Sequence, residues 1–299
     1  RTDPDLQKMH ALCPWFVTWD DHEVENNYAS DISQILDMDP AQFLLQRAAA
    51  YQAYWEMMPL RRSSIPKGPD MQLYRKASYG RLAELFVLDT RQYRTDQTNG
   101  DKSSPLNENA LDKKRTMLGP DQKRWLTDNL RRSGGRWNVM AQQVMMGMND
   151  ITAGTEKNYS MDQWPGYAYE RMELVRFLQQ RKISNPVVLT GDIHTNWVND
   201  LRVDDRETNK PVVATEFVGT SITSGGNGQD KPAAHDARLA ENPGCKFFNA
   251  QRGYLRCTVT DKTWQTDYVV MDKVTEQNGT ATVRASFVVE SGKPGAQTA

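Results

Sequence analysis

Residues 186–196 read Pro-Val-Val-Leu-Thr-Gly-Asp-Ile-His-Thr-Asn, an apolar run that leads directly into Asp192 and His194. A short apolar run bounded by Pro and Gly is typical of a buried strand in a parallel sheet. In open α/β sheets, ligands bind in the crevice beyond the carboxyl ends of the strands. The stretch therefore predicts an α/β fold with a functional site where this strand gives way to a loop.

A second cluster of acids and histidine lies about 170 residues earlier in the chain. Residues 14–18 (PWFVT) are again apolar and β-favouring, and they lead into residues 19–23 (WDDHE). Because both clusters follow predicted strands, we expect them to converge at one edge of the sheet. Asp, His and Asn side chains at such a point are typical ligands of a hard to borderline divalent metal ion. The two clusters together favour a metal-dependent hydrolase.

The composition limits the classes of function. The chain has 299 residues, a formal net charge of -1 and no long basic run, which argues against specific nucleic-acid binding and attraction to an anionic membrane. No apolar run approaches the roughly 20 residues of a membrane span, and no signal-peptide pattern is present. Cys13, Cys245 and Cys257 lack CxxC spacing, so neither a zinc knuckle nor a disulfide framework is predicted. A small or locally recognised substrate fits better, and the redox compartment stays open.

The apolar pattern predicts one α/β domain over residues 1–290 and a flexible tail at 291–299. Helices are predicted at residues 40–58, 119–132 and 168–181. Strands are predicted at residues 71–77, 82–88, 137–146, 186–190 and 212–218, followed by a hairpin series at 254–259, 263–271 and 282–289. Polar or Gly-rich loops are predicted at residues 95–114, 152–167 and 219–228, and a polar excursion continues to Asn249.

Several common catalytic motifs are absent from the sequence. His22 and Glu23 do not begin an HExxH motif, because the fifth position is Asn26, and this excludes the helical zinc-protease geometry. The chain also contains no GxSxG elbow, no GxxxxGKS or GxxxxGKT loop and no GxGxxG fingerprint. The usual serine hydrolase, P-loop and dinucleotide-binding functions are therefore not predicted.

Five segments, in order along the chain, resemble the alkaline phosphatase D (PhoD-like) family of metallophosphatases. They are residues 19–27 (WDDHEVENN), 88–94 (LDTRQYR), 137–144 (WNVMAQQV), 189–194 (LTGDIH) and 216–222 (EFVGTSI). Each is a weak signal alone, but five in family order make coincidence improbable. The resemblance implies an α/β, four-layer, calcineurin-like sandwich of two mixed sheets flanked by helices. It also implies hydrolysis of phosphate esters by a metal-activated hydroxide, as an alkaline phosphatase or phosphodiesterase, and a secreted, periplasmic or cell-surface location.

The resemblance also assigns roles within the two clusters. Asp21 would be a metal ligand, and His22 a proton donor or phosphate contact beside it. Asp192 and His194 resemble the family's Gly-His-x-His pair, with Asp192 in place of the first His, and would both bind metal. Alternation along an extended segment would point these two side chains the same way. An Asp in place of a His favours a hard ion over zinc, so divalent or trivalent ions, calcium and iron, are the expected cofactors.

Neighbouring polar residues are expected in supporting roles. Asp20 and Glu23 would orient the metal ligands, because metal sites need such contacts to fix ligand geometry. Asn27 would hold the loop or touch substrate, and Asn196 is a weaker candidate for the site. His235 lies outside every motif and is expected to be a surface or structural residue.

Two pairs of residues have both a functional and a structural interpretation. Arg91 and Arg94 would clamp phosphate bidentately, or one of them would form a structural ion pair beside Asp89. In the wider metallophosphoesterase superfamily, which the resemblance brings in, a His that binds metal stands at the position of Gln142 and Gln143. One of these glutamines would therefore face the site, or its amide would satisfy neighbouring backbone groups. The sequence leaves both alternatives open.

The start of the sequence is interpreted as a cut inside a domain. The chain begins at Arg1 and approaches the first cluster within about 12 residues, whereas an α/β site usually draws ligands from several strand ends. The family's N-terminal β-domain and the first half of its catalytic domain, with an early metal-binding Asp and a Cys ligand, have no counterpart here. The expected fold is therefore truncated at its N-terminus. The alternative function is a non-catalytic fragment without the N-terminal metal ligands, and substrate preference and oligomeric state stay open.

Overall fold

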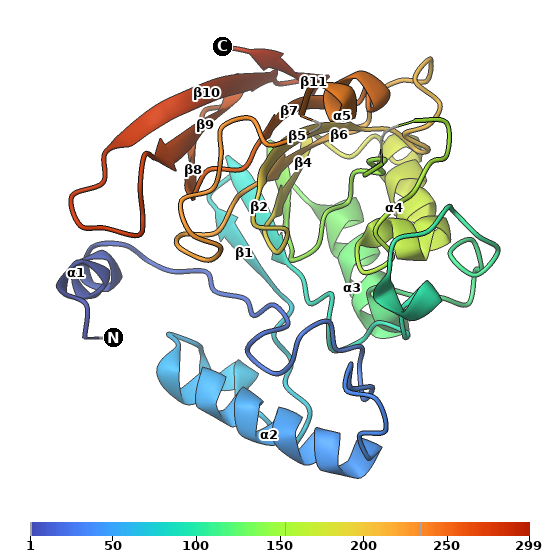
Figure 1. Cartoon of the computed structure of the whole chain (residues 1–299), viewed down its shortest axis with the longest axis vertical. Helices are drawn as coiled ribbons and strands as arrows, with labels where there is room; N and C mark the ends of the chain where they lie inside the picture. The colour runs from blue at the N-terminus through green and yellow to red at the C-terminus, as the bar shows by residue number, and fades with distance from the viewer. Residues whose placement is uncertain (1, 153, 234) are drawn as a thin grey trace.

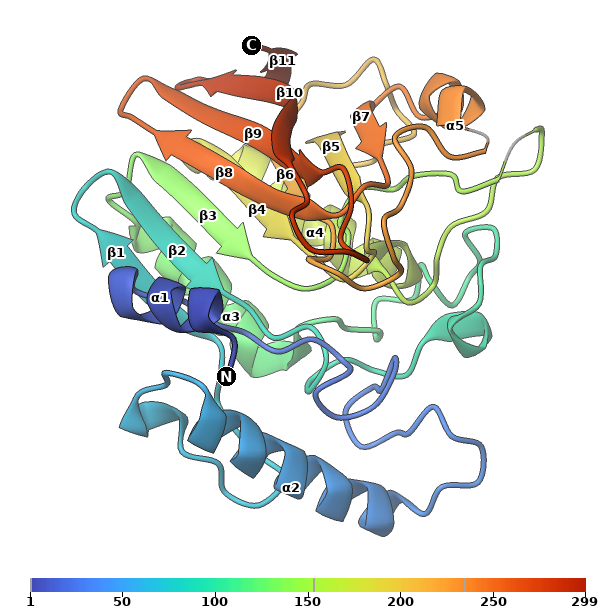
Figure 2. The same ribbon diagram turned by 60° about the vertical axis from the view of Figure 1, so that its left-hand side comes forward.

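The computed structural model describes residues 2–152, 154–233 and 235–299, and it shows an α/β fold with two sheets (Figure 1 and Figure 2). Its elements, where η marks a short 3-10 helix, are in chain order α1 (Pro4–Leu12), α2 (Pro40–Met57), η1 (Arg62–Ser64), β1 (Arg75–Tyr79), β2 (Ala83–Val87), η2 (Thr98–Asp101), α3 (Gly119–Arg132), β3 (Trp137–Ala141), η3 (Trp164–Tyr167), α4 (Ala168–Gln180), β4 (Pro186–Thr190), β5 (Asn196–Leu201), β6 (Ala214–Val218), α5 (His235–Glu241), β7 (Cys245–Asn249), β8 (Gly253–Val259), β9 (Thr263–Met271), β10 (Ala281–Glu290) and β11 (Lys293–Thr298). No helix among the described residues is both long enough and apolar enough to cross a membrane.

The larger sheet has seven strands in the order β1-β2-β3-β4-β6-β5-β7. β2, β3, β4 and β6 run parallel to one another, whereas β1 and β5 are antiparallel to their neighbours. α3 connects β2 to β3 and α4 connects β3 to β4, because parallel neighbours need a crossover connection. The carboxyl ends of the four parallel strands therefore open at the same edge of the sheet, as the sequence predicted for β4.

Helices α3 and α4 cover one face of this sheet (Figure 1). Leu126 and Leu130 of α3, and Leu174 and Leu178 of α4, are buried in one cluster with apolar residues of β2, β3 and β4. Residues four apart lie on the same side of a helix, so each pair forms an apolar stripe that faces the sheet. Burial of each leucine contributes about 2 kcal/mol to folding, and the packing holds the strands that carry the loops of the site.

The four-stranded sheet, in the order β11-β10-β9-β8, packs on the opposite face of the larger sheet (Figure 2). Val187 and Phe217 of the larger sheet share one buried cluster with Trp264, Tyr268 and Phe287 of the smaller one. The α/β architecture with two sheets is therefore as expected. All pairings in the smaller sheet are antiparallel, however, so this sheet is not mixed. Among the described residues no helix lies over the outer face of β8 to β10, so three layers are seen in place of the expected four (Figure 1 and Figure 2).

A smaller core ties the first acidic cluster to α2. The ring of Trp19 stacks on the ring of Tyr51 with 4.2 Å between centroids, and Tyr54 packs against its edge. Asp39 caps the N-terminus of α2, and Pro40 follows at the first helical position, where a missing N–H is tolerated. The aromatic residues of α2 therefore make core contacts, and they fix the segment that carries the acids.

Residues 14–18 form no strand, contrary to the expectation from their apolar character. The carbonyl of Val17 accepts a hydrogen bond from the Arg75 guanidinium at 2.6 Å. The hydroxyl of Thr18 donates to the carbonyl of Leu88 at 3.2 Å. This segment is thus tied to the rest of the protein through side-chain hydrogen bonds, and not through pairing with a neighbouring strand.

The end of the chain also differs from the expectation. Residues 291–299 are not a loose tail, because β11 pairs with β10 and the backbone N–H of Ala296 donates to Asp200 at 2.9 Å. α1, α5, β5 and β7 were not predicted either. β5 reads NWVNDL, and its six residues are all buried although three of them are Asn or Asp. The composition of β5 does not indicate a buried strand. This strand is buried because it pairs with β6 and β7 on its two sides.

Candidate functional site

Gln143, which follows β3, joins the first acidic cluster to the strand ends. Its side-chain amide donates to the hydroxyl of Thr18 and the carbonyl of Trp19, both at 2.8 Å, and to the carbonyl of Leu88 at 3.0 Å. Its own carbonyl oxygen accepts from the backbone N–H and the hydroxyl of Thr90 at 3.0 and 2.7 Å. The geometry therefore supports the structural interpretation of this glutamine, in which the buried amide satisfies backbone groups.

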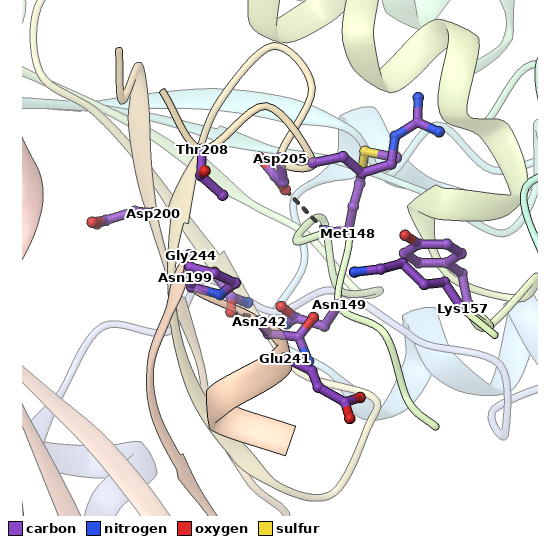
Figure 3. Close-up of a pocket in the computed structure, with 13 residues that line it drawn as sticks. Met148, Asn149, Lys157, Asn199, Asp200, Asp205, Thr208, Glu241, Asn242 and Gly244 are labelled. Carbon is purple, nitrogen blue, oxygen red and sulfur yellow. Dashed lines mark hydrogen bonds between the residues drawn. The ribbon is translucent and has the colours of Figure 1, made fainter. Parts of the chain in front are cut away.

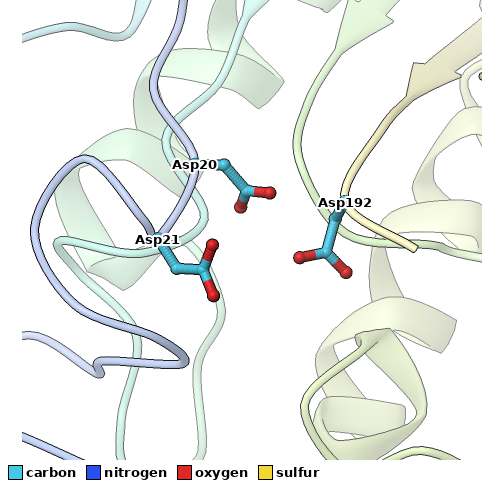
Figure 4. A group of neighbouring side chains, drawn as sticks. All are labelled: Asp20, Asp21 and Asp192. Carbon is cyan, nitrogen blue, oxygen red and sulfur yellow. The ribbon is translucent and has the colours of Figure 1, made fainter. Parts of the chain in front are cut away.

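Asp20, Asp21 and Asp192 converge at this edge of the sheet (Figure 4). One carboxylate oxygen from each residue lies within 4.8 Å of the others. The backbone N–H groups of His22 and Asn27 donate to the two oxygens of Asp21, at 2.8 and 2.9 Å, and fix the orientation of this buried carboxylate. The aspartates of the two clusters thus meet in space, as expected for two loops at one sheet edge.

The structure places Asp20 inside the carboxylate group, although the sequence suggested an orienting role for it. Glu23 has such a role, because its carboxylate accepts from the backbone N–H of Asp20 at 2.8 Å. Burial raises the pKa of Asp20 well above its ordinary value of 3.8, against the charge of Arg91, and the charges of Asp192 and Asp21 add to the rise. Three carboxylates this close together favour a cation between them.

The structure does not bring His22 or His194 into this group, and both side chains are exposed. The φ angles of Asp192 and His194 are 63° and 55°, so the backbone turns here. The expectation of an extended segment with both side chains on one side was therefore wrong. The carbonyl of His194 accepts from the hydroxyl of Thr220 at 2.9 Å and from the guanidinium of Arg252, and these contacts hold the turn. Such left-handed conformations of non-glycine residues are uncommon and cluster at functional sites.

Arg91 lies among the aspartates and is fully buried. Its Nε donates to Asp20 at 2.8 Å and its Nη1 to Asp162 at 3.2 Å. Its Nη2 donates to Asp192 and lies 3.9 Å from Asp21. Burial works to lower the pKa of Arg91, but the four carboxylates outweigh it and raise this pKa well above its ordinary value. A guanidinium buried in this way supports the ion-pair interpretation and not the phosphate clamp.

Sequence reasoning missed Asp162 and Gln163, which are buried in the predicted loop at residues 152–167. The amide of Gln163 donates to Asp192 at 2.5 Å, opposite the oxygen that Arg91 contacts. The signal that could have found them is the Trp-Pro-Gly sequence directly after Gln163, which forms the buried turn η3. A large aromatic residue in a loop indicates that the loop packs inward with its polar neighbours.

Asp162 is held between two arginines. It accepts hydrogen bonds from Arg94 at 2.8 Å and from the amide of Gln97 at 3.0 Å, and it pairs with Arg91. Burial alone would raise the pKa of Asp162, but the charges of Arg91 and Arg94 outweigh it and lower the pKa to about 2. Arg94 is itself fully buried, so it too is engaged in structure and not exposed for substrate.

Asn27 holds the first loop, which was one of its two expected roles. Its carbonyl accepts from Arg94 at 2.9 Å and from Gln97 at 2.6 Å. Its side-chain amide donates to Asp101 at 3.1 Å. With its backbone N–H on Asp21, Asn27 therefore connects the carboxylate group to the buried arginines behind it.

Gln142 and Asn196 use their side chains in the interior. Gln142 donates to the hydroxyl of Thr190 at 2.7 Å and accepts from the indole of Trp164 at 3.1 Å. Asn196 donates to the side chain of Asn249 at 3.0 Å. Both amides are buried, and their hydrogen-bond partners lie outside the carboxylate group. The structure therefore favours a structural role for these two residues.

Comparison with known proteins shows the family to which this chain belongs. The family model described as PhoD-like phosphatase matches residues 1–268. The chain belongs to the PhoD-like phosphatase family. It is 50% identical over 295 residues to alkaline phosphatase D of Bacillus subtilis (strain 168), and the match covers 99% of this chain and 50% of the relative. A solved structure described as "Structure of PhoD" matches with a TM-score of 0.95 and 50% identity, covering 99% of this chain and 56% of that one. The chain thus spans about half the length of the curated relative.

The donor set of this PhoD-like chain fits a hard cation. The three converging atoms are carboxylate oxygens, which Ca²⁺ and other hard ions prefer. No His or Cys joins these aspartates within ligand distance in the described ranges, and zinc usually takes such ligands. A carboxylate offers about four lone-pair sites, so the hydrogen bonds from Arg91 and Gln163 leave acceptor sites for a metal ion.

A separate pocket of about 400 Å³ lies between β5, the loop after β3 and the end of α5 (Figure 3). Two of its three acids are ion-paired within the chain, because Asp205 contacts Arg171 at 2.5 Å and Asp200 contacts Lys246 at 3.4 Å. The third, Glu241, accepts from the backbone N–H of Gly154 at 2.9 Å. The pocket shares no lining residue with the group of three aspartates. We therefore regard it as a polar hollow apart from the candidate site.

Proposed function

We propose that this chain hydrolyses phosphate esters, as an alkaline phosphatase or phosphodiesterase, with metal ions held by Asp20, Asp21 and Asp192. The observation that carries the proposal is the convergence of these carboxylates at the carboxyl edge of a parallel sheet. Membership of a phosphatase family supports it, as does the 50% identity to a protein named alkaline phosphatase D. Because the chain spans half of that relative, the activity is a proposal for these residues.

The chemistry follows from the charge of the substrate. A phosphate ester repels anionic nucleophiles, and neutral water attacks it slowly. A bound metal ion lowers the pKa of water and neutralises the phosphoryl oxygens. His22 is exposed directly beside Asp21, where its imidazole would donate a proton to the leaving alkoxide or a hydrogen bond to phosphate. His194 is exposed on the turn that carries Asp192, and we propose it as a further ligand or substrate contact.

Calcium and iron are the proposed ions, because an all-carboxylate donor set suits hard cations. On the strength of the family resemblance we propose a secreted, periplasmic or cell-surface location. The partner is a phosphate ester. We propose the loops at residues 95–114 and 152–167 as the rim that selects between monoesters and diesters.

The second candidate is a chain that binds metal but does not turn over substrate. The described residues bring three carboxylates together, whereas Ca²⁺ takes six to eight oxygen ligands. Two of these carboxylates already accept hydrogen bonds from Arg91. Weak metal binding by the isolated chain would follow from this shortage of ligands.

Hydrolysis assays of the purified chain separate the two candidates. We expect turnover of an aryl phosphate or a bis-aryl phosphate diester that EDTA abolishes and that added calcium and iron restore. Asp21→Asn and Asp192→Asn should each lower the rate by more than about 100-fold, because loss of ligand charge removes metal from the site. His194→Ala is expected to act in the same direction.

Two control variants keep this test specific. Asp200→Asn changes a buried, ion-paired aspartate of β5 outside the group, and His235→Ala changes a histidine outside the motifs. Both should keep the wild-type rate. Metal bound to the wild type without any turnover on either substrate would favour the second candidate, and turnover by protein that elemental analysis shows to be metal-free would exclude a metal-dependent reaction.

A further inference from the structure

A fully buried guanidinium lies between carboxylates that come from three separate segments. Arg91 contacts Asp20 at 2.7 Å and Asp162 at 3.2 Å, and it also contacts Asp192. Asp21 lies 3.9 Å away. Carboxylates packed this closely repel one another unless a cation lies between them. Arg91 is therefore placed where a cation is needed whether or not a metal ion is bound.

Arg91 is also held by contacts other than those with the three aspartates. Its backbone N–H donates to the buried carboxylate of Asp89 at 3.0 Å. Its partner Asp162 is anchored by Arg94 and Gln97, at 2.8 and 3.0 Å. The guanidinium thus belongs to a buried network, and a network of this kind holds a charged group in one position.

We infer that Arg91 is a built-in counter-cation, which assembles Asp20, Asp21 and Asp192 before any metal ion binds and shares their negative charge with the ion afterwards. The inference rests on the proposed function, because it concerns the same metal site. It makes Arg91 a positioning residue and not a substrate contact. Its consequence is that the guanidinium and a metal ion stabilise the same carboxylates, so removal of one makes the protein depend more on the other.

Thermal unfolding with and without metal tests this inference. The proteins are wild type, Arg91→Gln and Arg171→Gln, each measured in EDTA and in calcium or iron, together with bound metal by elemental analysis. Arg171 is the matched control, because it is also fully buried and paired with a partly buried carboxylate, Asp205, but lies outside the site. Both variants should unfold at lower temperature than wild type in EDTA.

The expected result is a difference in the response to metal. Metal should raise the unfolding temperature of Arg91→Gln at least about twice as much as that of wild type, because the ion replaces the lost positive charge. The response of Arg171→Gln should equal that of wild type. If Arg91→Gln gains no more from metal than wild type and Arg171→Gln do, Arg91 is only a structural ion-pair residue and the inference is overturned.

A second variant covers the case in which Arg91→Gln does not fold. Arg91→Lys keeps the charge but has a shorter reach and lacks the planar fork that joins several carboxylates. A single ammonium cannot reach all the carboxylates that Nε, Nη1 and Nη2 of Arg91 contact, so some of their charge is left uncompensated. The rise in unfolding temperature on adding metal should therefore be larger than for wild type but smaller than for Arg91→Gln, and a rise equal to that of wild type would overturn the inference. If wild type binds no metal and its unfolding temperature does not change on adding metal, both this inference and the proposed function are overturned. If the proteins bind metal but their unfolding temperatures rise equally, only the inference is overturned.

Discussion

Asp162 shows how a single buried charge depends on its partners. Its carboxylate accepts from Arg94 and pairs with Arg91, and all three side chains are buried. When one member of a buried ion pair is removed, the remaining charge stays buried without compensation. Single substitutions in this network are therefore expected to cost far more stability than substitutions of ion pairs at the surface.

Asp162→Asn should lower the free energy of unfolding by about 3–5 kcal/mol, because it leaves two buried guanidiniums short of a counter-charge. The matched control is Asp128→Asn, which breaks an exposed pair with Arg131 and should cost less than about 1 kcal/mol. Urea titration of the three proteins measures both values. Equal stability of the two variants would show that Asp162 is not needed to balance Arg91 and Arg94.

The stability that Asp162 provides should also depend on pH in a defined direction. Its pKa falls from an ordinary value of 3.8 in the unfolded chain to about 2 in the folded protein. A group whose pKa is lowered by folding stabilises the protein above its unfolded pKa, and this contribution is lost as the pH falls through its folded pKa. The stability difference between wild type and Asp162→Asn should therefore be constant above pH 4 and shrink between about pH 4 and 2. A difference that stays constant down to pH 2 would contradict the assignment.

At the scale of elements, the turn η3 places two polar residues of the site. Asp162 and Gln163 directly precede η3, whose four residues are all buried. Gly166 lies within this turn, and a Cβ atom there would stand only 2.0 Å from the carbonyl oxygen of Met161. The close approach of the two backbone segments thus requires glycine at this position.

Gly166→Ala should therefore lower the free energy of unfolding by about 1–3 kcal/mol or more, because the added methyl group displaces the backbone before Asp162. It should also weaken metal binding, since Gln163 would lose its position beside Asp192. Gly134→Ala is the control, because a Cβ at Gly134 meets open space. Urea titration and metal titration measure the two effects, and a Gly166→Ala protein that matches the control in both would rule out this role of the turn.

At the scale of the whole molecule, the two-sheet body and the segment before it differ in burial. Both faces of the larger sheet are covered, by α3 and α4 on one side and by β8 to β11 on the other. α1 has no buried residue; Leu12 at its end is 78% exposed, and Phe16 after it is 55% exposed. Exposed apolar side chains promote association between molecules, and a net charge of -1 provides little repulsion against it.

The double variant Leu12→Ser and Phe16→Ser should therefore reduce self-association without a loss of stability. Its free energy of unfolding should stay within about 0.5 kcal/mol of wild type, because exposed side chains contribute little to folding. Val17→Ser, at a buried neighbour in the same segment, should cost more than about 1.5 kcal/mol. Sedimentation at several concentrations and urea titration test the two claims. Unchanged association of the double variant would show that this surface is not responsible.

Local sequence signals were sufficient to predict several of the helices and strands. The helices at α2, α3 and α4 and the strand β4 lie within one residue of their predicted bounds, because apolar periodicity together with Pro and Gly at the ends determines such elements locally. The same signals located both acidic clusters at one edge of a sheet. They failed for the short strands β5, β7 and β11, since such strands take their conformation from the strands beside them.

The sequence by itself determined an α/β chain with a phosphatase-like pair of acidic clusters, because strand and helix patterns and motif order are local properties. Only the tertiary structure decided which side chains meet. The left-handed backbone at Asp192 and His194 turned the histidine away and left Asp20 as the third member of the group. The burial of Arg91 between Asp162 and Asp192, 71 and 101 residues away, was equally invisible in the sequence. Charge balance inside a folded protein depends on distances in space, and sequence spacing does not contain them.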